Sequence, residues 1–253
     1  MLSPGRVRDL ADQAMRNDYV THTGFLSLSE QSMAVPETEK AGVRACFYGG
    51  HEEADRKILY FLPSYMDEET LTRQEDSGEG FIACLRIRVR GARFTKEIGH
   101  RDCLGALMHL GIEREQIGDI LTEASHAFVF VMKDIGPFII SELTRVSHTV
   151  VSVREVPLSA CQIRPVLEER TGSVASERLD AVTAMAFRLS RTAAAKLIEG
   201  EKAAVDGRLV TDPDRRLLPG QKISLRGYGR FLYQGEVKRT KKDRLMVRVF
   251  LYR

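Results

Sequence analysis

The stretch Ser176–Gly227 constrains the fold of this 253-residue chain more than any other part of the sequence. Apolar residues recur in it at three- and four-residue steps in two short runs, which predicts two short helices. The first run is Leu179, Val182 and Ala186, and the second is Ala194, Leu197 and Ile198. Ser176 and Ser190 are the candidate N-caps, and Gly200 stands where a helix end favours a left-handed residue. We therefore expect two short helices joined by a tight turn.

Strand and turn signals follow the two helices. Ala203–Val205 is expected to be extended, and Asp206-Gly207 after it is a strong hairpin signal because these residue types tolerate a positive φ. Leu217–Gly220 predicts a turn into a second strand, Lys222–Leu225. The unit expected from this stretch is a pair of helices packed against a small sheet.

Charge is distributed unevenly along the chain. Residues 173–253 contain 18 Lys and Arg against 9 Asp and Glu, a net charge of +9. Because the whole chain carries +3, residues 1–172 carry −6. A small basic domain is typical of proteins that bind a phosphate backbone, with arginines and helix N-termini on the phosphates. A plainer interpretation stays open, in which the charged faces are solvated, Arg178 and Asp180 orient each other, and Ser190 is only a cap.

Several motifs follow one another here in a fixed order. They are Arg178-Leu179-Asp180, Leu189-Ser190-Arg191, Leu197-Ile198 with Gly200, Val205-Asp206-Gly207, and Gly220-Gln221 before Ile223-Ser224. In this order they resemble the S-four domain, the alpha-L RNA-binding motif of a small-subunit ribosomal protein, several tRNA synthetases and pseudouridine synthases. That family usually has asparagine where this chain has Asp206, which suits the turn but lowers the local positive charge. The resemblance implies RNA binding, and the candidate RNA-binding residues are Arg178, Asp180, Ser190, Arg191, Lys196, Lys202, Asp206, Gly207, Arg226 and Arg230.

The chain is long enough for two or three domains, and we expect an α+β protein. The expected domains are an N-terminal α/β domain at 1–75, a βαββαβ domain at 76–168, and an S-four-like domain with a C-terminal hairpin at 173–253. No apolar run approaches the ~18 residues of a membrane helix, and MLSPGRVRDLADQ at the start contains no apolar signal-peptide core. A cytoplasmic protein with no membrane partner is therefore expected.

The four cysteines are scattered and form no C-x-x-C pair. They are Cys46, Cys84, Cys103 and Cys161. Such a pattern favours reduced thiols in a cytoplasmic protein, and a zinc site would need ligands from distant positions. No metal, cofactor or small-molecule substrate is expected.

Local patterns suggest a first set of elements at the N-terminus. Arg6–Asn17 has helical spacing, Val43–Tyr48 is a candidate strand, and Glu52–Phe61 is expected to be a helix that ends before Pro63. Residues 68–80 are polar and acidic and are expected to be a linker or an exposed loop. His51 lies among acidic residues without metal-ligand spacing and is expected at the surface.

Residues 81–158 show an ordered alternation of strand and helix signals. The expected strands are Phe81–Val89, Ile117–Thr122, Ala127–Met132 and Thr149–Val156, and the expected helices are Ile98–Leu110 and Lys133–Ser147. The order is β-α-β-β-α-β, the ferredoxin-like arrangement that RNA-recognition motifs also have. Because a fold alone does not give a function, this order leaves the role of the domain open.

Two features of these strands bear on RNA binding. Arg86, Arg88 and Arg90 share one face of the first strand by their period of two, and they form either a second basic stripe or an ordinary solvated face. Phe128 and Phe130 share a face of another strand and could stack bases, but their surroundings favour core packing.

The C-terminal residues predict a basic hairpin. Phe231–Val237 and Leu245–Leu251 are the candidate strands, and the cations of the tip include Lys238, Arg239, Lys241 and Lys242. These side chains either reach between phosphates or are simply solvated, and the sequence does not separate the two.

Further segments widen the resemblance to nearly the whole chain. The segment IGHRDCLGALMHLGIEREQIGDI at 98–120, Phe47-Tyr48-Gly49-Gly50 and Ala54-Asp55-Arg56 are similar to those of the YlmH family, which combines them with a C-terminal S-four domain. The resemblance implies a non-catalytic RNA-binding protein whose partners are rRNA, tRNA and the large ribosomal subunit. It further implies a role in ribosome-associated quality control of stalled peptidyl-tRNA, and a link to cell division is discussed for the family.

Two other classes of function remain as alternatives. An RNA-modifying enzyme with an accessory S-four domain is one, because Arg178-Leu179-Asp180 is superficially similar to the catalytic motif of pseudouridine synthases. No catalytic signature accompanies it, and His100-Arg101-Asp102 lacks the other motifs of a kinase. The other alternative is a cell-division scaffold for which RNA binding is incidental.

Overall fold

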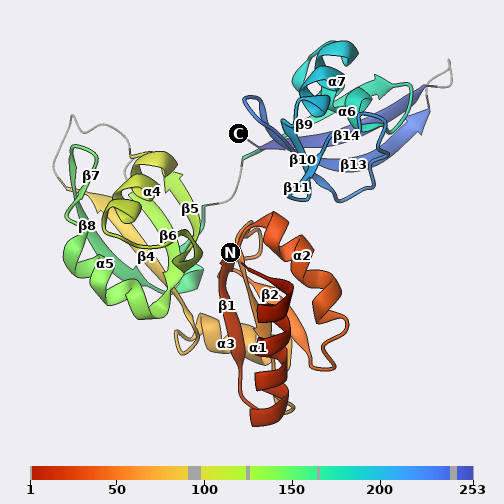
Figure 1. Ribbon diagram of the computed structural model, residues 1–253. Coiled ribbons are helices and arrows are strands. Elements are labelled where there is room, and N and C mark those ends of the chain that lie inside the picture. The colour runs from red at the N-terminus through yellow and green to blue at the C-terminus, as the bar shows by residue number, and fades with distance from the viewer. Residues whose placement is uncertain (1, 91–97, 124–125, 164–165, 240–243, 253) are drawn as a thin grey trace. The chain divides into compact units, whose positions relative to one another are not determined.

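The computed structural model describes residues 2–90, 98–123, 126–163, 166–239 and 244–252 (Figure 1). The chain forms two compact units, Met1–Arg164 and Pro165–Arg253, each with its own hydrophobic core. Together they give the expected α+β class. The expected boundary between residues 1–75 and 76–168 falls within the first unit and stays a prediction.

The first unit begins with a three-stranded antiparallel sheet. Its strands β1 (Thr21–Leu26), β3 (Lys57–Phe61) and β2 (Ala45–Tyr48) lie in the order β1-β3-β2. Helices α1 (Pro4–Asn17) and α2 (Leu28–Thr38) pack on one face of this sheet and form an apolar cluster with it.

Two sequence predictions in this segment are wrong. The end of the predicted helix Glu52–Phe61 is strand β3, the central strand of the sheet. Leu59 faces the helices while Tyr60 faces the rest of the unit, so both faces are buried and the apolar run shows no strand periodicity. The predicted loop 68–80 contains helix α3 (Glu68–Asp76), capped by the Asp67 side chain.

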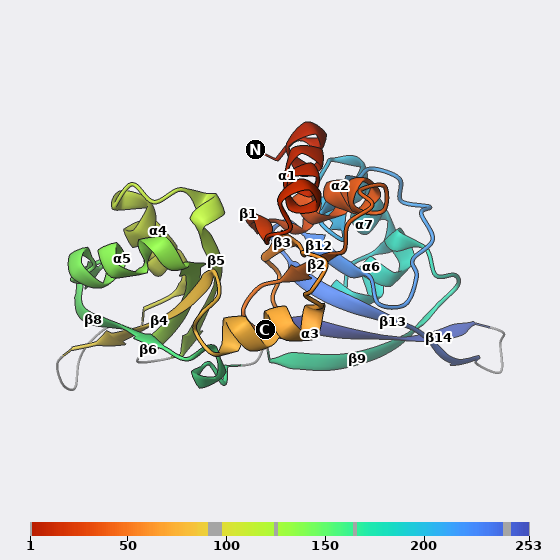
Figure 2. The same ribbon diagram turned by 90° about the horizontal axis from the view of Figure 1, so that it is seen from below.

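A five-stranded antiparallel sheet forms the rest of the first unit. Its strands are β4 (Ile82–Val89), β5 (Ile117–Glu123), β6 (His126–Met132), β7 (Arg145–Val146) and β8 (Thr149–Val156), in the order β5-β6-β4-β8-β7. Helices α4 (His100–His109) and α5 (Gly136–Glu142) lie on the same face of it (Figures 1 and 2). The predicted βαββαβ order is confirmed, although the helix expected at Lys133–Ser147 is shorter and β7 follows it.

The opposite face of this sheet is covered in part by the N-terminal segment. Ile58 and Tyr60 of that segment belong to one buried cluster with Phe128 and Phe130, which are 4% and 0% exposed. The prediction that these phenylalanines belong to the core is confirmed. Gly50 lies directly against the Phe130 ring. It has φ +88°, and a Cβ at this position would lie 2.5 Å from the ring, so only glycine allows this close approach.

The second unit is a six-stranded antiparallel sheet with two helices. Its elements are β9 (Leu167–Val174), α6 (Leu179–Phe187), α7 (Arg191–Glu199), β10 (Ala203–Val205), β11 (Arg208–Val210), β12 (Lys222–Leu225), β13 (Gly229–Arg239) and β14 (Leu245–Tyr252). The strand order is β11-β10-β12-β13-β14-β9, and β9 runs along β14 (Figure 2). Strand β9 was not predicted, because its sequence LEERTGSV is mostly polar and only pairing with β14 makes it a strand.

The helix pair is present, with differences at its ends. Residue Arg178, rather than Ser176, occupies the N-cap position of α6, whereas Ser190 caps α7 as predicted through its hydroxyl and the Ala193 amide. Gly200 has φ −80°, and Glu201 after it is the left-handed residue with φ +58°. Both helices bury their apolar faces against the sheet.

Candidate nucleic-acid interface

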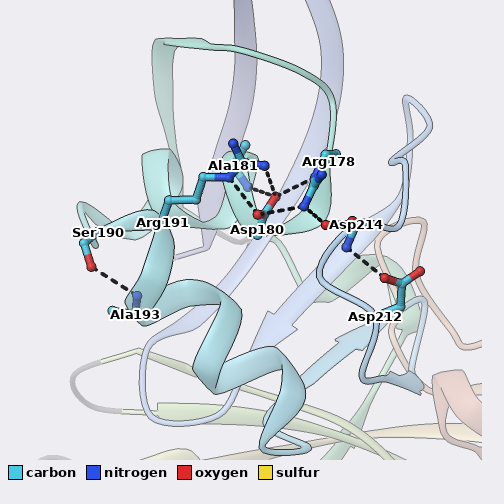
Figure 3. Close-up of polar contacts among 8 residues, drawn as sticks. All are labelled: Arg178, Asp180, Ala181, Ser190, Arg191, Ala193, Asp212 and Asp214. Carbon is cyan, nitrogen blue, oxygen red and sulfur yellow. Dashed lines mark hydrogen bonds and ion pairs between the residues drawn. The ribbon is translucent and has the colours of Figure 1, made fainter.

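Asp180 is the centre of the polar contacts that join the two helices of the second unit (Figure 3). This residue lies in the first turn of α6 and is 3% exposed. Its Oδ2 accepts a hydrogen bond from Arg191 Nε at 2.7 Å, and its Oδ1 accepts one from the Ala181 amide at 2.7 Å. Arg178 donates to both oxygens at 3.3 Å. One buried carboxylate therefore orients one arginine from each side of the helix joint.

The environment of Asp180 keeps its carboxylate ionised. Burial alone would raise its pKa, but the hydrogen bonds from Arg191, the Ala181 amide and Arg178 outweigh burial and lower the pKa below the ordinary value. A carboxylate held by three donors in this way is suited to positioning arginines rather than to accepting a proton from a substrate.

A loop covers the N-terminus of α6. The Leu179 amide donates to the Arg215 carbonyl at 2.8 Å and the Asp180 amide to the Pro213 carbonyl at 3.0 Å. Arg178 is held from this loop too, by an ion pair with Asp214. The first amides of α6 are thus satisfied within the chain, so this helix N-terminus does not offer the phosphate site expected from the sequence.

Five of the cations predicted to bind RNA lie in different surroundings. The side chains of Arg178 and Arg191 are 34% and 50% exposed and are tethered to Asp180. Lys196, Lys202 and Arg226 are exposed and form no salt bridge with any residue that the structure describes. The last two are neighbours, because the Arg226 amide donates to the Lys202 carbonyl at 2.8 Å.

Asp206 and Gly207 form the predicted hairpin turn, with φ +50° and +77°. The Asp206 carboxylate accepts hydrogen bonds from the Lys222 amide at 2.8 Å and from Gln221 Nε2 at 3.2 Å. These contacts shape the turn between β10 and β11 and fix β12 beside it.

The remaining predicted cations that the structure describes lie on β13 and in the first unit. The Arg230 guanidinium lies 4.7 Å from the centroid of the Tyr252 ring. Lys238 and Arg239 are exposed near the end of β13, whereas Lys241 and Lys242 lie outside the described residues. Arg86 and Arg88 of β4 are half-buried and exposed, respectively, and Arg90, which follows the end of this strand, is exposed.

A buried polar cluster joins the two sheets of the first unit and was missed by the sequence analysis. Asp119 of β5 accepts hydrogen bonds from the Asp55 and Arg56 amides at 2.8 and 3.0 Å, and from His51 Nε2 at 3.2 Å. Arg56 donates to the Ile117 and Phe25 carbonyls. The His51 side chain is only 6% exposed, so the surface position expected for it is wrong. The segment Ala54-Asp55-Arg56 therefore has a structural role between the two sheets.

In the described part of the chain, no group of three or more His, Cys, Asp or Glu residues could hold a metal ion. All four cysteines are buried free thiols, and burial raises the pKa of Cys103 to about 11. Among the same residues, no helix is both long and apolar enough to cross a membrane.

The fold and the charge define a class: an α+β protein in which a unit with a ferredoxin-like sheet precedes a basic unit of two helices on a sheet. Residues 82–160 match the family described as "Putative RNA-binding domain in YlmH". Over 226 residues the chain is 32% identical to the Bacillus subtilis (strain 168) "Ribosome-associated protein quality control protein P2". The match covers 89% of this chain and 84% of that protein. The chain therefore belongs to the YlmH family.

A solved structure is also similar. It is the "Cell division protein ylmH from Streptococcus pneumoniae", with a TM-score of 0.51 and 16% identity over 62% of this chain and 90% of that chain. At this level of identity the similarity concerns the α+β fold alone.

Proposed function

We propose that this protein is a non-catalytic RNA-binding protein of the ribosome that acts in quality control of stalled peptidyl-tRNA on the large subunit. The observation that carries the proposal is the basic second unit, in which exposed Lys196, Lys202 and Arg226 pair with no described carboxylate. The Bacillus relative is named as ribosome-associated and the matching family as RNA-binding, and both names support the proposal.

The mechanism is electrostatic docking on a folded RNA. Arg191 is held in place by Asp180, so less side-chain entropy is lost when its guanidinium binds a phosphate through two hydrogen bonds. Lys202 and Arg226 add two adjacent charges at one end of the sheet. Contacts of this kind position the protein on a phosphate backbone and read the shape of the RNA more than its sequence.

The contacts of Asp180 argue against the alternative of an RNA-modifying enzyme. This aspartate is similar in motif to a synthase nucleophile, but its oxygens accept bonds from two arginines and an amide, and it is nearly fully buried. Turnover of RNA by the purified protein would favour the enzyme instead.

Co-sedimentation with purified ribosomal subunits at moderate salt tests the proposal. The full chain is expected to migrate with the large subunit, and Lys202→Gln/Arg226→Gln is expected to shift it toward the light fractions. Arg6→Gln/Arg16→Gln on α1 is the matched control, since it removes the same charge from exposed sites of the first unit. A wild-type chain that stays in the light fractions overturns the proposal and favours the division scaffold.

A further inference from the structure

The five-stranded sheet of the first unit carries a cationic surface on the face opposite α4 and α5, where the N-terminal segment leaves that face open. In one row across the sheet, Arg86 of β4 lies directly opposite Phe128 of β6 and Arg154 of β8. In the next row, Arg88 lies opposite His126 and Ser152. We call Arg86, Arg88, Arg154 and His126 the open sheet surface.

Two features of this surface are unfavourable in the protein by itself. Arg86 and Arg154 are directly opposed on neighbouring strands, with Cβ atoms roughly 4.5–5.5 Å apart, and like charges in such pairs destabilise a sheet. Neither arginine forms a salt bridge with any residue that the structure describes. The Arg86 Nε is buried and has no hydrogen-bond partner among the residues that the structure describes. An anion bound between the two guanidinium groups would relieve the repulsion and satisfy this donor.

The same face cannot bind bases as RNA-recognition motifs do. The aromatic residues that would stack bases, Phe128 and Phe130, are buried in one apolar cluster with Ile58 and Tyr60 of the N-terminal segment. What remains open carries Arg86, Arg88 and Arg154, and the Glu123 carboxylate lies beside it, 3.4 Å from His126 Nε2. Charge without an exposed ring favours a phosphate backbone over bases as the ligand.

The spacing of the arginines fits a strand of phosphates. Arg86 and Arg88 are two residues apart on β4, so they are separated by roughly 6.8 Å along the strand. This distance is similar to the spacing of successive phosphates in a nucleic-acid strand. Arg154 widens the surface across the sheet, so one phosphate can contact arginines from two strands.

We propose that the open sheet surface is a second RNA site, which binds the phosphate backbone through Arg86, Arg88 and Arg154 and stacks no bases. This inference rests on the proposed function, because it assigns a second contact with the same class of partner. It adds Arg154 and His126, which the sequence analysis did not identify, since only strand pairing brings them beside β4.

The test is fluorescence anisotropy of a fluorescein-labelled 16-nucleotide oligouridine with the full chain at several salt concentrations. Arg88→Gln/Arg154→Gln is compared with Arg101→Gln/Arg145→Gln, which removes two exposed charges elsewhere in the same unit. Each lost phosphate contact on a single strand lowers the slope of log K against log salt by about 0.7, so the first pair is expected to lower it by about 1.4. This corresponds to about 25-fold weaker binding at 0.1 M salt if the proteins bind equally at 1 M. Arg88→Lys/Arg154→Lys is expected to restore the slope.

The outcomes separate this inference from the proposed function. If the wild type binds the oligonucleotide and the two glutamine pairs have equal affinities and slopes, the second site is refuted while the ribosomal role stands. If Arg88→Gln/Arg154→Gln loses co-sedimentation with subunits but keeps oligonucleotide binding, the surface contacts an acidic protein and the inference is overturned. Failure of the wild type to sediment with subunits refutes the proposed function instead.

Discussion

The Asp180 carboxylate and the Arg191 guanidinium, eleven residues apart in sequence, form a 2.7 Å hydrogen bond across the joint between α6 and α7. The carboxylate is buried whereas half of the arginine side chain is exposed. The bond therefore ties the orientation of a surface cation to the packing of the helix pair.

Replacing Asp180 with asparagine is expected to destabilise the second unit. The substitution removes the charge that three donors share, and hydrogen bonds to charged groups contribute about 1.5–3 kcal/mol. Hydrogen exchange of the α6 and α7 amides in urea measures the change in unfolding free energy. Glu199→Gln, an exposed acid at the end of α7, is the control and is expected to change that free energy little. Equal stability of the two variants would show that the contacts of Asp180 contribute nothing.

The stability of the second unit is expected to fall in acid through Asp180 and Glu177. Hydrogen bonds lower the pKa of Asp180 despite its burial, and the Tyr233 hydroxyl is the main cause of the lowered pKa of Glu177. A carboxyl whose folded pKa is depressed stabilises the fold above its unfolded pKa, about 3.9 for Asp and 4.3 for Glu, and this stability is lost as pH falls through the folded pKa. Unfolding free energies measured from pH 7 to pH 2 are expected to fall less steeply in Asp180→Asn and Glu177→Gln. Parallel pH profiles for wild type and both variants would contradict this assignment.

Alanine substitution is expected to affect RNA binding at Arg191 and stability at Arg178. Arg191→Ala removes a half-exposed cation, so it is expected to weaken RNA binding across sequences and to lower the salt slope by about 0.7–0.9. Arg178 is bridged by Asp180 and Asp214, so Arg178→Ala is expected mainly to lower stability. Anisotropy at several salt concentrations and thermal unfolding measure the two effects. If Arg191→Ala leaves affinity and slope unchanged, the helix pair does not carry the RNA-binding face.

Gly50→Ala is expected to loosen the junction between the two sheets of the first unit. The new Cβ would lie 2.5 Å from Phe130 Cδ1 in a left-handed backbone, which combines overpacking of about 1–3 kcal/mol with a φ penalty of about 1–2 kcal/mol. Gly78→Ala is the control, because Gly78 has φ +79° but nothing lies within 4 Å of its added Cβ. Thermal unfolding should show the larger loss for Gly50→Ala, and equal losses would mean that the Phe130 contact is unimportant.

Arg154→Gln is expected to stabilise the first unit in the absence of RNA. The substitution removes the charge opposite Arg86, and cross-strand pairs of this kind change stability by roughly 0.2–1 kcal/mol. Urea unfolding of the full chain measures the gain, with Arg145→Gln on β7 as the control. A loss of stability would mean that the two arginines share a favourable arrangement and that the repulsion argued for the open sheet surface is absent.

Much of the fold could be predicted where local rules apply. The Asp206-Gly207 turn, the Ser190 cap and the βαββαβ order follow from residues within a few positions of one another. Strand β3 and helix α3 could not be predicted in this way. The run Lys57–Phe61 is apolar on both faces, and the acidic α3 buries Glu75 against the Tyr60 hydroxyl and the Ile82 amide. In both elements, contacts with distant residues override the local pattern.

The sequence by itself determined the helix pair, the hairpin turn and the excess of positive charge at the C-terminal end, because these depend on residue type and short spacing. Only the tertiary structure decided which cations are tethered, such as Arg178 between Asp180 and Asp214, and which are left exposed. It also placed Arg154 beside Arg86, although the two residues are 68 positions apart in the chain. The physical reason is that hydrogen bonding, burial and charge repulsion act over a few ångströms in space, and only the folded chain sets those distances.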